Sequence, residues 1–145
     1  MQEKRKSHSE RNNHILELVA CGNEFFVSYE NFLKSPSGSV TDSTVISDFR
    51  YDNYEAVNLY GLPVGADRHL HFNIITAARM MDGQHEFFAV KVEIFKESDD
   101  FFVSLGTENC VIFDFPVNRT EDDLLKMSLV IRQFVTQMSN GRILV

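Results

Sequence analysis

The chain has 145 residues, of which 43% are hydrophobic and 24% charged, and its formal net charge is −7. This length suits one ordinary domain with its own core, and this composition excludes a chain that is disordered over most of its length. The acidic charge argues against nucleic-acid binding, because a negative body repels phosphate backbones.

The charge is not uniform along the chain. Four basic and two acidic residues lie among the first eleven, so the rest of the chain carries nine more acidic than basic side chains. We expect residues 1–9 to form a flexible polar N-terminus and residues 10–145 to form a single α+β domain. No apolar run approaches the roughly 18 residues that span a bilayer, and no export signal is visible, so we expect a cytoplasmic protein without membrane contact.

Residues 12–34 show a helical period. Apolar side chains recur at spacings of three and four along this segment. Gly22 interrupts the pattern and costs a helix about 1 kcal/mol, so a helix followed by a strand over residues 24–29 is the alternative. We prefer one helix, whose wide apolar face includes Phe25, Phe26, Tyr29, Phe32 and Leu33.

The middle of the chain alternates between apolar and polar residues. After a Ser-, Gly- and Pro-containing break at residues 35–39, the pattern predicts strands over 44–50 and 54–60, with Asp52 and Asn53 as the turn. A third strand is predicted over 68–76. Residues 77–81 fit a strand or a helical turn, and Asp82-Gly83 is a strong turn signal.

The last third predicts an antiparallel meander and a helix. Strands are expected over 86–96, 101–105 and 110–115, joined by short polar turns. Thr120 is expected to cap a helix that ends before Gly141, and acidic residues fill its first turn. Leu125 and Leu129 widen the apolar face of this helix.

These elements predict an α+β fold, in which an antiparallel sheet of five or six strands packs against the N-terminal and the C-terminal helix. Two other architectures stay open. One is similar to pleckstrin-homology folds, with a curved sheet closed by the terminal helix. The other is similar to small secretion chaperones, which match in size, acidity and apolar helix faces.

One short motif has metal-ligand residues. Asp67, His69 and His71 lie close together, and His69 and His71 share one face of a predicted strand, where His85 could join them. A zinc site needs three or four converging ligands, and one His-x-His pair is a weak signal, so we predict no metal. Glu93 lies on the wetter face of its strand, where an ion pair with another strand is the simplest expectation.

Signs of catalysis are missing from the sequence. Cys21 and Cys110 lie in apolar surroundings and are expected to be buried, reduced thiols. No nucleophile elbow and no glycine-rich phosphate-binding loop occurs. We therefore predict no catalytic residue, no cofactor and no enzymatic activity.

The surplus of apolar helix surface suggests a binding function. We expect a non-enzymatic protein-binding module that acts as an adaptor, chaperone or inhibitor through apolar helix faces and an acidic surface. The expected partner is a protein, which the acidic charge predicts to be basic, and a homodimer is expected. The residues expected to contact partners are Phe25, Phe26, Tyr29, Phe32, Leu33, Leu125 and Leu129.

Two alternatives remain for the function. The first is a small metal-dependent or acid–base enzyme that uses the region of Asp67, His69 and His71. The second is an acidic mimic of nucleic acid that inhibits a DNA-binding protein through clusters of carboxylates.

Overall fold

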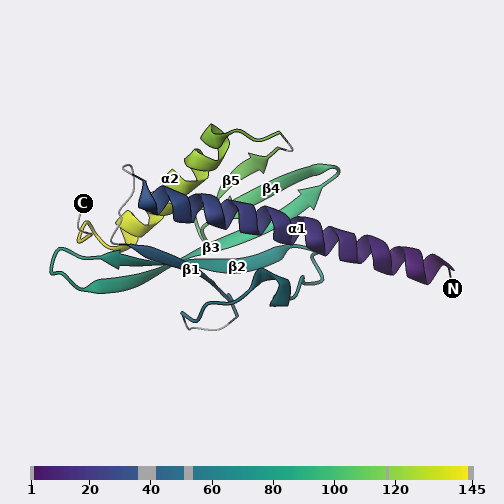
Figure 1. The fold of residues 1–145 in the computed structure, drawn as a ribbon, viewed down its shortest axis with the longest axis horizontal. Helices are drawn as coiled ribbons and strands as arrows, with labels where there is room; N and C mark the ends of the chain where they lie inside the picture. The colour runs from purple at the N-terminus through teal and green to yellow at the C-terminus, as the bar shows by residue number, and fades with distance from the viewer. Residues whose placement is uncertain (1, 36–41, 51–53, 117, 144–145) are drawn as a thin grey trace.

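The computed structural model describes residues 2–35, 42–50, 54–116 and 118–143, with side chains from residue 13 onward. It has a single antiparallel sheet of five strands in the order β1-β2-β3-β4-β5, with one helix before the sheet and one after it. The predicted α+β fold is therefore confirmed. Figure 1 shows the long first helix crossing the sheet, with its N-terminal end projecting beyond the strands.

Helix α1 spans Gln2–Lys34. The preferred single helix over residues 12–34 is confirmed, and its helical backbone also extends back to Gln2, through most of the segment that was expected to be a flexible N-terminus. Gly22 lies inside the helix at a close contact with the core: an added Cβ would lie 2.8 Å from Cδ1 of Leu59, so the Leu59 side chain would have to shift. The glycine thus lets the connection between β1 and β2 approach the helix axis closely.

Strand β1 spans Ser43–Ser47 and is shorter than predicted. The predicted strand over 54–60 is wrong: residues 54–58 are irregular, and a single 3-10 turn, η1, spans Leu59–Gly61. The alternating pattern arises because Val57 is half-buried and Leu59 is buried while their neighbours are exposed. The predicted turn at residues 52–53 lies outside the described residues.

The remaining strands form a meander. They are β2 at Leu70–Arg79, β3 at His85–Glu97, β4 at Asp100–Leu105 and β5 at Val111–Phe115. The open assignment of residues 77–81 is settled as strand through Arg79, and Met80 forms an isolated bridge with Ile143. In the register of β2 with β3, His71 lies opposite Glu93.

Helix α2 spans Glu121–Met138, and the predicted cap is confirmed. The hydroxyl of Thr120 accepts from the Asp123 N–H at 3.3 Å, and the Asp123 carboxylate accepts from the Thr120 N–H at 2.8 Å. Two N–H groups that a helix start leaves without partners are therefore paired. Of the helices in the described part of the chain, none combines the length and apolarity needed to cross a membrane.

Both helices pack on the same face of the sheet. The side chains of Leu70, Phe72 and Ile74 on β2 are fully buried in one core together with apolar residues of α1 and α2. The alternate residues of β2 point to the opposite face, because successive side chains of a strand point to opposite sides. That second face carries His71, which is only half-buried.

A buried polar network ties the core to the start of β1. The Tyr29 hydroxyl lies 2.8 Å from Oγ1 of Thr76, and Arg132 on α2 donates to Asp42 at 2.5 Å. Asp42 also accepts from the Arg79 N–H at 2.9 Å, and its side chain is completely buried. These contacts join α2 to the edge of the sheet.

Candidate functional site

The seven residues expected to contact partners fall into two groups. Four of the five on α1 are buried against the protein's own core: Phe25, Tyr29, Phe32 and Leu33, while Phe26 is half-buried. The sheet therefore covers most of the aromatic face of α1. By contrast, Leu125 and Leu129 on α2 are 40% and 49% exposed.

A groove lies between α1 and the N-terminal half of α2, with a volume of about 510 Å³. Leu124 and Leu125 lie on its α2 side. Val27 and Phe32 lie on its α1 side, and the side chain of Val27 is 48% exposed. Val27 was missed in the sequence because it lies off the main apolar stripe of α1, so that periodicity places it on the polar face.

Three carboxylates also line this groove: Glu24, Glu121 and Asp122. Glu24 forms an ion pair with Arg119, so part of its charge is balanced. Glu121 and Asp122 lie in the first turn of α2 and form no ion pair with any other described residue. Among the described residues that line the groove there is no basic side chain, so the groove combines apolar side chains with carboxylates.

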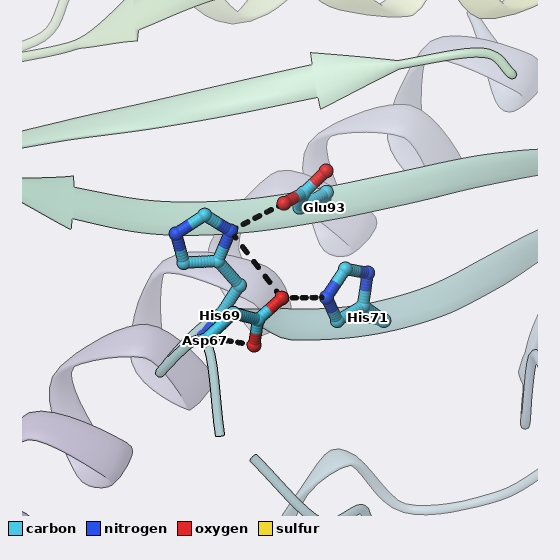
Figure 2. A group of neighbouring side chains, drawn as sticks. All are labelled: Asp67, His69, His71 and Glu93. Atoms are coloured by element: carbon cyan, nitrogen blue, oxygen red, sulfur yellow. Dashed lines mark hydrogen bonds and ion pairs between the residues drawn. The ribbon is translucent and has the colours of Figure 1, made fainter. Parts of the chain in front are cut away.

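On the other face of the sheet, four side chains with metal-ligand atoms converge. Figure 2 shows Asp67 and His69 from the segment before β2, His71 at the start of β2, and Glu93 on β3 pointing toward one another. One ligand atom of each lies within 4.8 Å of the others. The residues that the sequence singled out are thus brought together, and Glu93 joins them in place of His85.

The geometry of this histidine–carboxylate cluster rests on short polar contacts. Nε2 of His71 lies 2.8 Å from Oδ2 of Asp67, and Nδ1 of His69 lies 3.7 Å from the same oxygen. His69 Nδ1 is also hydrogen-bonded to Oε1 of Glu93. Glu93 was expected to form an ion pair with another strand; its partner in the structure is instead a histidine just before β2, through a hydrogen bond.

The orientation of Asp67 is held by the backbone. Its Oδ1 accepts from the His69 N–H at 3.0 Å, which turns Oδ2 toward the two imidazoles. That backbone bond and the His71 bond favour the charged form, so they hold the pKa of Asp67 below its usual range. Arg68, which lies between Asp67 and His69, has a positive φ of 65°. This bend in the chain lets the Asp67 side chain turn back toward His69 and His71.

Aromatic rings enclose the cluster on two sides. The Phe95 ring stacks on His69 with 4.7 Å between centroids, and the Phe49 ring lies 5.3 Å from His71. Nδ1 of His71 is buried and has no hydrogen-bond partner among the described residues. Asp67 is the most exposed of the four side chains, so the cluster opens to solvent beside it.

The two cysteines are both free. Cys21 is buried, as predicted, and burial raises the pKa of its thiol, with the charge of Arg119 acting against that shift. The prediction for Cys110 is wrong: this thiol is exposed, just before β5, and donates to the carbonyl oxygens of Gly106 and Thr107. The sequence suggested burial because the apolar strand residues follow Cys110 directly, but Cys110 itself lies in the connection before that strand.

Comparison of this chain with protein-family models, curated proteins and solved structures finds no significant match.

Proposed function

We propose that this protein is a non-enzymatic binding module that holds a basic, amphipathic segment of a partner protein in the groove between α1 and α2. The observation that carries the proposal is the combination of apolar side chains with three carboxylates and, among the described residues, no basic side chain in the lining. The sequence also predicts an acidic and apolar binding surface on the helices. The proposed surface lies between the two helices, because the face of α1 first expected to bind partners is mostly buried.

The apolar contribution comes from side chains that the protein itself leaves partly uncovered. Val27 and Leu125 lie on opposite sides of the groove, and about half of each side chain is exposed. Leu129 follows Leu125 by one helical turn and lengthens the apolar surface along α2. Covering these side chains removes apolar surface from water, which is the main favourable term in association.

The charges favour a basic occupant. Glu121 and Asp122 present two carboxylates at the end of the groove, and the whole chain carries a net charge of −7. Complementary charge raises the rate of encounter and disfavours acidic partners. A segment with apolar residues on one side and Lys or Arg on the other matches both features of the groove.

Binding accounts for the groove better than catalysis does. Its lining contains neither histidine nor cysteine, and its volume lies within the usual range of about 300–1,000 Å³ for binding pockets. We also propose that the protein works in the cytoplasm, where its two free cysteines would stay reduced.

The test compares three forms of the full chain as bait for partners in its native host: the wild type, Leu125→Arg and Met81→Arg. Met81 is exposed and apolar like Leu125 but lies in the turn between β2 and β3, away from the groove, so it is the matched control. We expect proteins that the wild type and Met81→Arg retain and that Leu125→Arg loses. A synthetic segment of such a protein should then bind the wild type directly.

Two outcomes contradict the proposal. One is equal recovery of every partner by wild type and Leu125→Arg. The other is a retained segment that is acidic or lacks an apolar side. Light scattering of the same three forms tests the expected homodimer: a dimer that only Leu125→Arg disrupts would show that a second copy, rather than a basic segment, occupies the groove.

A further inference from the structure

We propose that Asp67, His69, His71 and Glu93 bind one divalent transition-metal ion of the zinc type, as a closed four-ligand site on the face of the sheet away from the helices. This site is independent of the groove between α1 and α2 and lies on the opposite face of the sheet. It reverses the expectation that the sequence contains no metal site.

Two of the distances between ligand atoms lie near those of a zinc site. Zinc bound by nitrogen and oxygen at 2.0–2.1 Å in a tetrahedron places its ligand atoms about 3.3 Å from one another. The distance from Asp67 Oδ2 to His71 Nε2 is 2.8 Å, and the distance from the same oxygen to His69 Nδ1 is 3.7 Å. Both lie within about 0.5 Å of the tetrahedral edge, and Glu93 would have to turn away from His69 Nδ1, to which it is hydrogen-bonded, to share the ion.

The residue types select the class of metal. Two imidazoles with two carboxylates suit Zn²⁺ and neighbouring transition metals, whereas Mg²⁺ and Ca²⁺ prefer sites made only of oxygen ligands. With both histidines neutral, the two carboxylates carry two negative charges, which a divalent cation balances. Asp67 and Glu93 each form a hydrogen bond with one of the two histidines, so both carboxylates face the same point.

The four ligands come from positions that the fold holds in different ways. His71 and Glu93 are neighbours across β2 and β3, so the sheet register fixes their separation. Asp67 belongs to the irregular segment before β2, and its Oδ1 bond to the His69 backbone fixes its orientation. An ion bound to all four would therefore fasten this segment to the sheet, and the protein would be more stable with the metal than without it.

One of the two histidine ligands has no hydrogen-bond partner for its second ring nitrogen among the described residues. A histidine that binds metal through Nε2 carries its proton on Nδ1, and that N–H usually donates to a protein group. Nδ1 of His71 has no such partner among the described residues. Since loss of such a partner typically lowers affinity about 10–100-fold, we expect weaker binding than in a fully supported zinc site.

The test titrates full-length protein, freed of metal and of any affinity tag, with Zn²⁺, Co²⁺ and Mg²⁺ by calorimetry. We expect one Zn²⁺ per chain, the intense visible absorption of tetrahedral Co²⁺, a higher Tm with Zn²⁺, and no binding of Mg²⁺. His71→Ala should weaken Zn²⁺ binding by at least about 100-fold, because a ligand contributes more than its outer partners do. The matched control, His85→Ala, removes a histidine outside the cluster and should leave the affinity unchanged.

Glu93→Gln keeps the shape of the side chain and removes its charge, so it tests the site even if His71→Ala fails to fold. We expect it to weaken Zn²⁺ binding and to reduce the tetrahedral Co²⁺ signal. The proposal is overturned if the wild type binds no Zn²⁺, or if His85→Ala weakens binding as much as a cluster variant does. Binding of Mg²⁺ as tight as that of Zn²⁺ would also overturn it.

Discussion

Among single residues, Asp42 and Arg132 form the most deeply buried ion pair described. The Asp42 side chain has no exposed surface and that of Arg132 is 18% exposed. Removing two charges from water is costly, and the pair is tolerated because Asp42 accepts from both the guanidinium and the Arg79 N–H. The intact pair therefore adds little net stability, whereas loss of one partner leaves a buried charge without its counterion and is strongly destabilising.

We expect Asp42→Ala to lower the free energy of unfolding by about 3–5 kcal/mol, because it leaves a mostly buried guanidinium without its carboxylate. Urea denaturation measures the effect. Asp99→Ala, in the exposed turn before β4, is the control and should cost under about 0.5 kcal/mol. A loss for Asp42→Ala no larger than for the control would mean that Arg132 finds water or another acceptor.

Tyr29 makes stability depend on alkaline pH. Burial raises the pKa of Tyr29 to about 12, and the Thr76 hydrogen bond and the charge of Arg132 only partly oppose it. In the unfolded chain the pKa is about 10. Since the folded value is the higher one, the unfolded chain loses its proton first, and stability present below pH 10 falls as the pH rises toward 12.

We expect the urea midpoint of the wild type to fall between pH 10 and pH 12 more steeply than that of Tyr29→Phe, which has no proton to lose at this position. At pH 7 the variant should be slightly less stable, because Thr76 loses its partner. Parallel curves for the two proteins above pH 10 would refute a buried, protonated Tyr29.

At the scale of elements, the contact between α1 and η1 decides the role of Gly22. Glycine in a helix costs about 1 kcal/mol against alanine. Here a Cβ would lie 2.8 Å from Leu59 Cδ1, with Ile94 and Leu70 side chains at 3.4 and 3.5 Å. Overfilling such a site costs about 1–3 kcal/mol, which exceeds the gain in helix propensity.

Gly22→Ala should therefore lower the free energy of unfolding by about 1 kcal/mol in the wild type. In a Leu59→Ala background the clash is gone, and the same change should raise it by about 1 kcal/mol. A double-mutant cycle by chemical denaturation measures the difference. If Gly22→Ala has the same effect in both backgrounds, Leu59 does not restrict this position.

The pairing of β2 with β3 is the element-level feature on which the histidine–carboxylate cluster depends. The Met80 N–H donates to the Gln84 carbonyl at 2.7 Å, so three residues form the loop between these strands. A two-residue loop at Asp82-Gly83, the commonest for such a turn signal, would place Glu93 opposite Phe72, on the core side. One residue of register thus decides whether Glu93 reaches His69.

Considered as a whole, the molecule has two different faces. The helices cover one face of the sheet and form the acidic groove, and the other face carries the cluster (Figures 1 and 2). Because Glu121 and Asp122 contribute charge at the rim of the groove, partner binding should respond to ionic strength.

We expect the Kd for a basic partner segment to rise steadily with salt. Glu121→Gln together with Asp122→Asn should raise the Kd about five- to tenfold at low salt and flatten its salt dependence. The control, Asp99→Asn with Glu108→Gln, changes the net charge equally in turns away from the groove. Equal effects of the two double variants would indicate a general response to net charge, with no role for the groove.

Local patterns in the sequence were enough to predict the two helices and most of the strands. The spacing of apolar residues predicts α1, the Thr120–Asp123 pattern predicts the start of α2, and alternation predicts the meander, because each depends on neighbours within a few residues. Alternation gave a wrong prediction at residues 54–60, where the burial of Val57 and Leu59, the latter against α1, produces the pattern of a strand.

The candidate sites depended on contacts that no local pattern records. By itself the sequence determined the fold class, the two helices, the acidic charge and the His-x-His spacing. Only the tertiary structure decided that the aromatic face of α1 is covered, that Val27 and Leu125 share a groove, and that Glu93 meets the two histidines. These depend on strand register and helix placement, which are set by packing between residues far apart in the chain.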